Sequence, residues 1–536
     1  MRSWTKFRVG LGFLVLLLLL VGATAVFAQD GGTDTEALAA SAGDTAMSLN
    51  VLWVLIAGAF VFFMQAGFAL VETGFTRNKN VVHTMMMNVM VFCIGAIGYW
   101  LTGFALEFGG VNYTYPAISA ALPAWAFSPV TLGAWTDAAG NALLSNPLLI
   151  NGSGVLGLTG FMLGGIGANA GVLVFFFFQM VFMDTAATIP TGTMAERLKF
   201  VGFALMGLWV SMFIYPLIGN WVWGGGWLAN LGRSMGWGNG AVDFAGSGVV
   251  HTVGGALGLA GAIIIGPRIG KFNKDGSANA IAGHNIPMGA LGCIILFFGW
   301  FGFNPGSSLG FTGAFRNLAV LATINTLLAG AAGGCAGMLY MWLIGPTKKP
   351  DAGMSLNGLL AGLVAITAPC AFVDTTAAVI IGLIAGVLVC VATTVLEKAK
   401  VDDPVGAVPV HFVNGLWGVL AVGIFANGNP DTAAWNGVAT PVTGLLYGGG
   451  GQFLAQLAEA VSIAVVVLGT SLVFFSILKR LNLLRVSPAV ELAGLDMPEM
   501  GAEGYPKDWE PSAEAVAPYL PKGKGAAMPA PAAAGD

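Results

Sequence analysis

Two histidines lie in matching sequence contexts, and their chemistry suits hydrogen bonding to each other and to a small polar molecule. His251 follows Asp243 by eight residues, and His411 follows Asp403 by eight residues, each within an apolar stretch. Eight helical residues rise about 12 Å, so both imidazoles are expected near the bilayer midplane if these stretches are transmembrane helices. Ionisable side chains at that depth are costly and by default mark a pathway. The pair therefore predicts a shared polar site between two helices.

Two alternatives to a pathway remain open for this pair. Each histidine could be a buried residue that a neighbouring helix satisfies, or the two could be axial ligands of a haem, which would need a flat cavity. The five cysteines all lie in apolar runs and are odd in number, which argues against a disulfide framework or a CxxC metal site. We therefore expect no metal and no cofactor.

The composition defines the elements that must position these residues. Of the 536 residues 56% are hydrophobic and only 9% are charged, against ~25% charged in soluble domains. Such a chain cannot supply the polar surface of a soluble protein, so we predict an all-α integral membrane protein whose partner is the lipid bilayer. The net charge of −4 indicates no nucleic-acid partner.

Apolar runs long enough to cross the hydrocarbon core recur along the chain and predict eleven transmembrane helices. His251 falls in the fifth run and His411 in the tenth, and these two helices would run in opposite directions. We therefore predict two inverted five-helix repeats, at about 49–267 and 287–426, with a last helix as a brace. The predicted spans are 49–74, 81–106, 168–193, 199–222, 247–267, 287–304, 317–345, 355–371, 375–397, 406–426 and 449–478.

The two ends of the chain are predicted to lie on opposite sides of the membrane. Residues 1–28 resemble a secretory signal peptide, with an uncleaved first helix as the alternative, and 29–48 would be an extracytoplasmic lead. One alternate set of connections carries fourteen Lys and Arg, and the other carries two. This positive-inside bias predicts a multi-pass protein of the bacterial inner membrane, with residues 479–536 as a cytoplasmic tail that is disordered toward its end.

Several segments resemble the ammonium transporter (Amt/Rh) family. They include DFAGSGVVHTVGGALGLAGAIIIGPR at 243–268, GFTRNKN after the first predicted helix, GWFGFNPGSSLG in the sixth, and LLRVSPAVELAGLD at the start of the tail. The resemblance implies a homotrimer in which each subunit has its own narrow pore. It also implies that the tail is regulatory, with a PII-type nitrogen-signalling protein as its partner.

The resemblance implies roles for residues that lie along one path from the outside inward. Aromatic faces each stabilise a desolvating cation by about 0.5–2 kcal/mol, which agrees with an aromatic entrance. The implied residues are Trp223, Phe182, Ser307 and Asp243 for substrate recruitment, Phe182 and Phe303 for a stacked gate, and His251 and His411 for the pore.

Three residues raise separate questions. Asp184 places a carboxyl two residues after Phe182, where a small residue is expected, and could be a lineage-specific proton or cation contact. Glu72 raises a weaker question, since its side chain could simply reach the membrane interface. Pro409 removes a helix hydrogen bond two residues before His411 and is expected to bend that segment.

We thus expect a transporter rather than an enzyme. Ammonium would be recruited at the aromatic vestibule and deprotonated near the two histidines, and ammonia would cross a narrow hydrophobic pore. A passive Rh-like channel for NH3 or CO2 and an ammonium sensor are the alternative functions.

Overall fold

The computed structural model describes residues 35–109, 134–136, 142–145, 155–157, 160–164, 170–435 and 438–506. Apart from one antiparallel pair, β1 (Ala134–Thr136) and β2 (Ala142–Ser145), its regular elements are helical. Ten helices in these residues are long and apolar enough to cross a membrane, and α12 (Ala352–Thr367) is a shorter apolar helix. These ten and α12 coincide with the eleven predicted spans, so the all-α membrane fold is confirmed.

The first half of the chain supplies five spans, of which three contain a π-helical segment (η2, η5 and η6). Its elements are α2 (Thr35–Phe75), η1 (Asn78–Asn80), α3 (Val81–Gly98), η2 (Tyr99–Gly103), α4 (Phe104–Phe108), η4 (Phe161–Leu163), α5 (Ala170–Met194), α6 (Phe200–Trp209), η5 (Val210–Ile214), α7 (Tyr215–Val222), α8 (Leu231–Met235), η6 (Ser247–Thr252) and α9 (Val253–Ile265).

The second half supplies the other spans and the beginning of the tail. Its elements are α10 (Ile286–Gly306), α11 (Ala314–Leu343), α12, α13 (Thr375–Lys398), η7 (Val408–Val413), α14 (Asn414–Phe425), η8 (Pro430–Ala434), η9 (Leu445–Tyr447), α15 (Gly450–Arg480), α16 (Pro488–Ala493) and η10 (Asp496–Met500).

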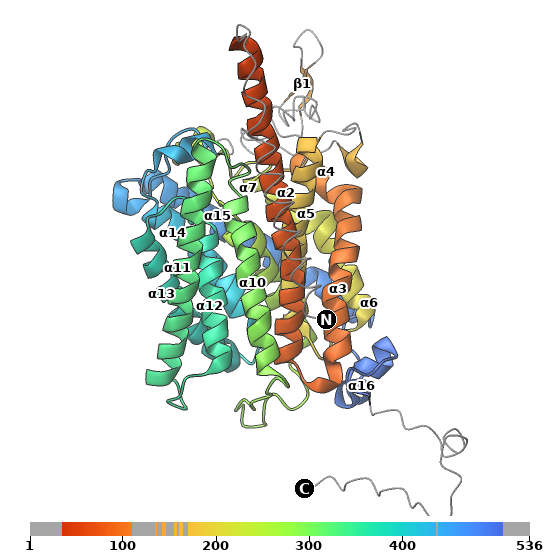
Figure 1. The fold of residues 1–536 in the computed structure, drawn as a ribbon. Coiled ribbons are helices and arrows are strands. Elements are labelled where there is room, and N and C mark those ends of the chain that lie inside the picture. Colours follow the sequence, from red (N-terminus) through yellow and green to blue (C-terminus); the bar gives the residue numbers. More distant parts are fainter. Residues whose placement is uncertain are drawn as a thin grey trace, which may run out of the picture.

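Helix α2 is longer than the predicted first span. It begins at Thr35, so most of the segment that we assign to an extracytoplasmic lead continues as helix into the membrane. Figure 1 shows α2 projecting beyond the other helices at the end opposite α16. The predicted signal peptide at 1–28 and the predicted disorder at the end of the tail lie outside the described residues.

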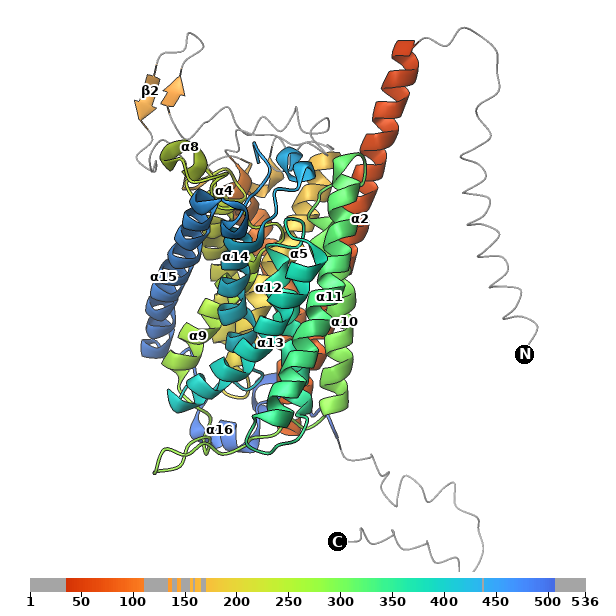
Figure 2. The same cartoon turned by 90° about the vertical axis from the view of Figure 1, so that its left-hand side faces the viewer.

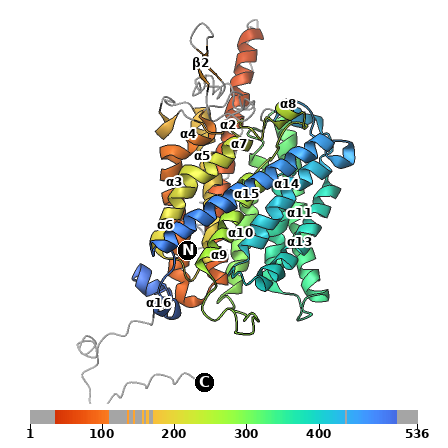
Figure 3. The ribbon, with the colours of Figure 1, turned by 180° about the vertical axis from the view of Figure 1, so that it is seen from behind.

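The spans form one bundle whose helices pack side by side (Figure 2). Glycine allows very close approach of α11, α12 and α13, because a Cβ at Gly362 would lie 2.2 Å from the Ala329 carbonyl oxygen and one at Gly386 2.2 Å from that of Gly333. Small residues at such interfaces replace the hydrophobic drive that is weak in lipid. Helix α15 crosses the bundle obliquely and packs on α9 and α14, as expected of a bracing last helix (Figure 3).

Both candidate histidines lie in π-helical segments at the start of a span. His251 lies in η6, which continues into α9, and His411 lies in η7, which continues into α14. Pro409 lies in the first turn of η7, where its missing N–H removes no hydrogen bond within the helix, contrary to the expectation from the sequence. The Asn414 side-chain amide donates to the Pro409 carbonyl at 2.9 Å. A π-helical turn absorbs an irregular hydrogen-bond pattern without breaking the helix, and it is frequent at functional sites.

Charged residues gather at the end of the bundle where the tail docks. Arg268 donates to both Asp402 oxygens, at 2.9 and 3.0 Å, and to Glu196 at 3.1 Å, and Glu196 also pairs with Arg77. Burial alone would raise the pKa of Asp402, but the hydrogen bonds from Arg268 and the charges of Arg197 and Arg268 lower it to about 2. The cluster therefore holds the connections between spans together as an ionised network.

The described part of the tail folds back onto the start of α3. The Asn80 side chain accepts from the Leu495 backbone N–H at 3.0 Å, and Asp496 accepts from the His83 backbone N–H at 2.9 Å. Arg485 pairs with Glu491 at 2.8 Å. The tail is thus hydrogen-bonded to the end of the bundle at Leu495 and Asp496.

Candidate functional site

The two histidines lie in direct contact at the centre of the bundle. Their Nδ1 atoms are 3.1 Å apart, and their rings are nearly parallel, with centroids 5.2 Å apart. Because an Nδ1–Nδ1 hydrogen bond needs one donor and one acceptor, a single hydrogen lies between them. The convergence predicted from the two Asp-x7-His contexts therefore exists, although the residues are 160 positions apart in the chain.

Aromatic rings surround the histidine pair. His251 is fully buried and stacks on Trp300 at 5.3 Å and on Phe303 at 5.6 Å, and Phe68 lies 6.2 Å from His411. The Nε2 atom of His251 has no hydrogen-bond partner in the described residues. A buried polar nitrogen without a partner is costly, so this atom is suited to meet a small polar guest.

Phe182 and Phe303 stack directly outward of the histidines. Their centroids are 3.9 Å apart with an angle of 18° between the rings, and α5 and α10 supply one ring each. Both side chains are buried. The stacked pair separates the histidines from the next cavity, and a molecule could pass only if one of the rings moved.

A cavity on the side of this ring pair away from the histidines, here called the outer cavity after the predicted topology, contains the predicted recruitment residues Trp223 and Ser307. The Trp223 ring lies 6.1 Å from the Phe182 ring and nearly perpendicular to it. The Ser307 hydroxyl donates to the Phe303 carbonyl at 2.9 Å, so its oxygen lone pairs can accept from a cation. The outer cavity is lined by Phe178, Gln179, Phe182, Trp223, Phe244, Ser307 and Leu309.

Asp243 supports this cavity without lining it. Its carboxylate accepts four backbone N–H groups, from Gly246 and Ser247 on Oδ1 and from Gly248 and Val249 on Oδ2. Burial raises the pKa of this carboxyl to about 6 although these four donors lower it. Its backbone carbonyl accepts the indole N–H of Trp223 at 2.7 Å. Asp243 is therefore a positioning residue for Trp223 and for the start of η6.

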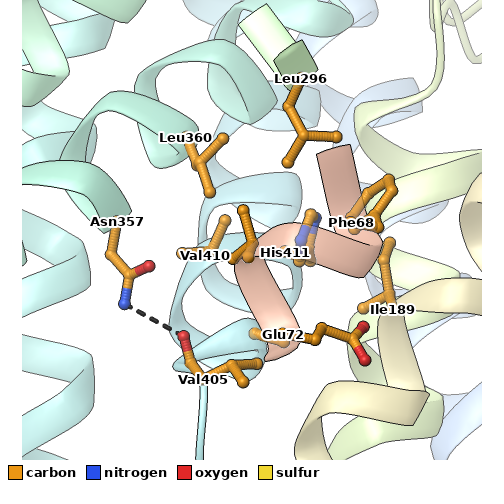
Figure 4. A pocket seen from close by; sticks show the side chains of 11 residues that line it. Phe68, Glu72, Ile189, Leu296, Asn357, Leu360, Val405, Val410 and His411 are labelled. Atoms are coloured by element: carbon orange, nitrogen blue, oxygen red, sulfur yellow. Dashed lines mark hydrogen bonds between the residues drawn. The ribbon is translucent and has the colours of Figure 1, made fainter. Parts of the chain in front are cut away.

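A second cavity, here called the inner cavity, lies on the other side of the histidine pair. Figure 4 shows His411, Phe68 and Glu72 around it, with the amide of Asn357 bonded to the Val405 carbonyl. The inner cavity is lined by Phe68, Val71, Glu72, Ile189, Leu296, Asn357, Leu360, Val405, Ala407, Val410 and His411.

The two carboxyl groups that the sequence left in question have different positions. Glu72 does not reach the interface; it is 3% exposed and lines the inner cavity. Asp184 is buried, one of its oxygens has no partner in the described residues, and it is not among the residues that line either cavity. At about 100° per residue it lies on the side of α5 roughly opposite Phe182. It is thus not a second gate contact.

Sequence reasoning missed three rings of the site: Trp300, Phe68 and Phe178. Trp300 precedes Phe303 by three residues and Phe178 precedes Phe182 by four, so helical spacing places each on the face of a predicted gate residue. That spacing is the signal that could have found them. Phe68 precedes Glu72 by four residues on the same helix, so the two share a face of that helix. Only the structure shows that this face lines the inner cavity.

These parts together form one path through a helical membrane protein. An aromatic and hydroxyl-bearing cavity, a stacked ring pair, a histidine pair and an inner cavity follow one another inside the bundle. Polar and ionisable groups buried in a membrane-spanning bundle by default mark a pathway for a small molecule or ion.

The chain belongs to the Ammonium Transporter Family, whose sequence model matches residues 52–505. It is 41% identical over 494 residues to ammonium transporter Amt2 of Archaeoglobus fulgidus, covering 92% of this chain and 94% of the relative. It is 34% identical over 478 residues to ammonium transporter 1 member 3 of Solanum lycopersicum, covering 87% and 95%. Members of this family are transporters and not enzymes.

Solved structures agree with this assignment. A protein described as "Sensor Amt Protein" superposes with a TM-score of 0.70 at 34% identity, over 85% of this chain and all of the other. Mep2 of Candida albicans superposes with a TM-score of 0.66 at 23% identity, over 82% of this chain and 87% of the other, which supports the fold.

Proposed function

We propose that the protein transports ammonium by recruiting NH4+ in the outer cavity and passing NH3 along the histidine pair. The observation that carries the proposal is the Nδ1–Nδ1 contact of His251 and His411, flanked by two cavities and screened by the stacked phenylalanines. Family membership supports the same substrate.

The outer cavity suits a small cation that is losing its water. The Trp223 and Phe182 rings offer aromatic faces, and the Ser307 oxygen offers lone pairs. Passage then requires the Phe182 and Phe303 rings to separate. Asp243 has no part in direct binding, because backbone donors occupy both of its oxygens.

The histidine pair suits the neutral form of the substrate. Ammonia can both donate and accept hydrogen bonds, and the unpartnered Nε2 of His251 offers it a partner at the narrow point. Potassium carries the same charge as ammonium but cannot lose it by deprotonation, so an apolar pore excludes potassium. Selectivity would follow from proton loss rather than from a ring of charges.

The double variant His251→Ala, His411→Ala tests this function. General acid–base groups contribute ~10²–10⁴-fold, so methylammonium uptake into proteoliposomes should fall by about 100-fold or lose its exclusion of potassium. Unchanged uptake together with unchanged potassium exclusion would exclude the proposal. The variant Trp209→Ala is a matched control, because Trp209 stacks on Phe474 away from both cavities.

Sensing is the second candidate, because one structural neighbour at 34% identity is described as a sensor. Ammonium-dependent current on a solid-supported membrane separates the candidates. Current with ammonium and none with potassium supports electrogenic transport, electroneutral flux supports a passive Rh-like channel for NH3 or CO2, and binding without flux supports a sensor.

Assembly, topology and regulation are part of the same proposal. We infer a homotrimer in the bacterial inner membrane, with the start of α2 outside and α16 in the cytoplasm, from the family resemblance and from the bias of Lys and Arg. A PII-type protein is the proposed partner of the docked tail. Co-purification of such a protein from nitrogen-replete cells is the expected result, and its absence there would count against this partner.

A further inference from the structure

The inner cavity contains a feature that the outer cavity does not have, namely a carboxyl group among its lining residues. Glu72 lies near the end of α2 and lines the same space as His411 (Figure 4). Among the residues that line the outer cavity, none carries a carboxyl group. The two cavities must therefore treat a cation differently.

Neutral polar groups hold the Glu72 carboxyl in place. The Asn88 side-chain amide donates to Oε2 at 2.9 Å, and the Thr191 hydroxyl oxygen lies 2.8 Å from Oε1 and 2.9 Å from Oε2. These contacts join α2, α3 and α5. They fix the orientation of the carboxyl toward the cavity without neutralising it.

The hydrogen count at Thr191 favours a protonated Glu72. The Thr191 hydroxyl has one hydrogen, yet its oxygen also lies 2.6 Å from the Thr188 carbonyl, which can only accept. If that hydrogen goes to Thr188, the short contact between Thr191 and Glu72 needs a hydrogen from the carboxyl. The geometry thus fits a carboxyl that holds a proton while the cavity is without a cation.

No basic side chain among the described residues is paired with Glu72. None of the ion pairs among the described residues includes Glu72. Asp403 acts electrostatically on Glu72 and carries a charge of the same sign. A buried carboxylate without a counter-ion is costly, so its negative charge needs either a proton or a small cation from the cavity.

We propose that Glu72 is the proton-exchanging residue of an inner ammonium site. The inference rests on the proposed function. Ammonia that leaves His411 takes the proton of the Glu72 carboxyl, so that one N–H bond forms and one O–H bond breaks. The products are NH4+ and the Glu72 carboxylate, which attract each other until the ammonium leaves. A proton from water on that side then restores the carboxyl.

The rest of the cavity suits an ion of this size. The Phe68 ring lies beside His411 and offers an aromatic face, and Ile189 and Leu296 exclude water from one side. An aromatic face together with one carboxylate binds a monovalent ammonium group well. The His411 ring lies on the same cavity and delivers ammonia into it.

If Glu72 had only a structural role, it would connect α2, α3 and α5 by hydrogen bonds and exchange no proton. The experiment must therefore detect the proton of the Glu72 carboxyl. Infrared difference spectra of the full protein in proteoliposomes report protonated carboxyl groups. Ammonium chloride should remove a protonated-carboxyl band in the wild type, whereas potassium chloride should leave it. The variant Glu72→Gln should show no such loss.

Glu107→Gln is the matched control. Glu107 is also fully buried, accepts the Tyr99 hydroxyl at 2.7 Å and lies at the opposite end of the bundle, outside both cavities. It should keep the ammonium-sensitive band. Transport by Glu72→Gln should fall about 10-fold with its half-saturating ammonium concentration changed less than twofold, because protons from water replace part of the contribution of a general acid.

Each result decides the inference. A wild-type spectrum without an ammonium-sensitive carboxyl band overturns it, even where Glu72→Gln fails to fold. A band that persists in Glu72→Gln, or a transport rate within twofold of the wild type, overturns it as well. If the wild type transports no ammonium, the proposed function fails; if it transports normally and Glu72→Gln equals it, only the inner site fails.

Discussion

The two histidine-bearing segments are built on one plan and placed in opposite directions. In each, an aspartate lies three residues before a glycine with positive φ and eight residues before the histidine: Asp243, Gly246 (φ 108°) and His251, or Asp403, Gly406 (φ 77°) and His411. Both aspartates accept backbone N–H groups at the start of a π-helical turn. The plan thus fixes the depth of the imidazoles.

The two segments differ in how firmly the aspartate is bound and in what the adjoining cavity contains. Asp243 accepts four N–H groups, whereas Asp403 accepts three, from Gly406, Ala407 and Val408. The outer cavity is aromatic with a hydroxyl, and the inner cavity includes the Glu72 carboxyl. Matching backbone arrangements thus bring the two histidines together, although the adjoining cavities differ in chemistry.

Replacing Asp243 or Asp403 by asparagine tests whether the number of bound N–H groups matters. These variants should show the largest effect, a loss of stability. In Asp243→Asn, one oxygen becomes an amide nitrogen that faces two N–H donors, and each unsatisfied buried donor costs about 1–3 kcal/mol. Asp403 has three donors on its two oxygens, so the amide nitrogen of Asp403→Asn can face a single donor, and the expected cost is about half as large. Melting temperatures of the purified variants measure both, and equal losses would contradict the difference in capping.

The pH dependence of stability sharpens the contrast between Asp243 and the ionised cluster at the other end. The pKa of Asp402 is about 2 in the fold and 3.8 in its absence, so ionised Asp402 contributes about 2 kcal/mol above pH 4. This contribution is lost as pH falls through 2. For Asp243 the pKa is raised to about 6, so its contribution is present at low pH and is lost as pH rises through 6.

The measurement is the melting temperature as a function of pH for the wild type and Asp402→Asn. The difference between the two proteins should shrink between pH 4 and 2, where the wild-type carboxyl becomes protonated. A difference that stays constant over this range would show that the pairing with Arg268 does not depend on ionisation.

Truncation of the outer cavity should have the smallest effect. In Trp223→Ala the cation loses one aromatic face, which corresponds to about 0.5–2 kcal/mol, or about 2- to 30-fold in half-saturating ammonium concentration. Ser307→Ala should cost about 1 kcal/mol, or roughly 5-fold, through loss of one acceptor. Uptake as a function of external ammonium measures both.

The control for the outer cavity is Trp209→Ala, which removes an equal ring outside it. A rise in half-saturating concentration that is as large in Trp209→Ala as in Trp223→Ala would mean that the loss of a ring acts through stability. In that case the effect of Trp223→Ala would not show that the outer cavity binds ammonium.

Sequence patterns predicted those features that depend on long-range averages or on rare residues in apolar surroundings. Eleven runs of hydrocarbon-crossing length gave the spans, and four histidines in 536 residues made the matching contexts of His251 and His411 conspicuous. Burial of a histidine is costly, so its presence in an apolar run carries information. A phenylalanine or tryptophan in the same run carries little, which is why Trp300 and Phe68 were missed.

Other features depend on three-dimensional contacts that no spacing encodes. The burial of Glu72 follows from Asn88 and Thr191 on two other helices. The docking of Leu495 on Asn80 joins residues 415 positions apart. The helical start at Thr35 was missed because an Ala-rich polar segment resembles an exposed lead, although alanine also has the highest helix propensity.

The length of α2 matters for spectroscopic measurements made away from the pore. Its 41 residues extend about 60 Å, roughly twice the hydrocarbon thickness of a bilayer. The part that rises above the other spans continues the same helix without a break (Figure 1). A spectroscopic label attached near Leu38 would turn with the body of the molecule, and so would report tilting of the whole subunit instead of the motion of a loose end.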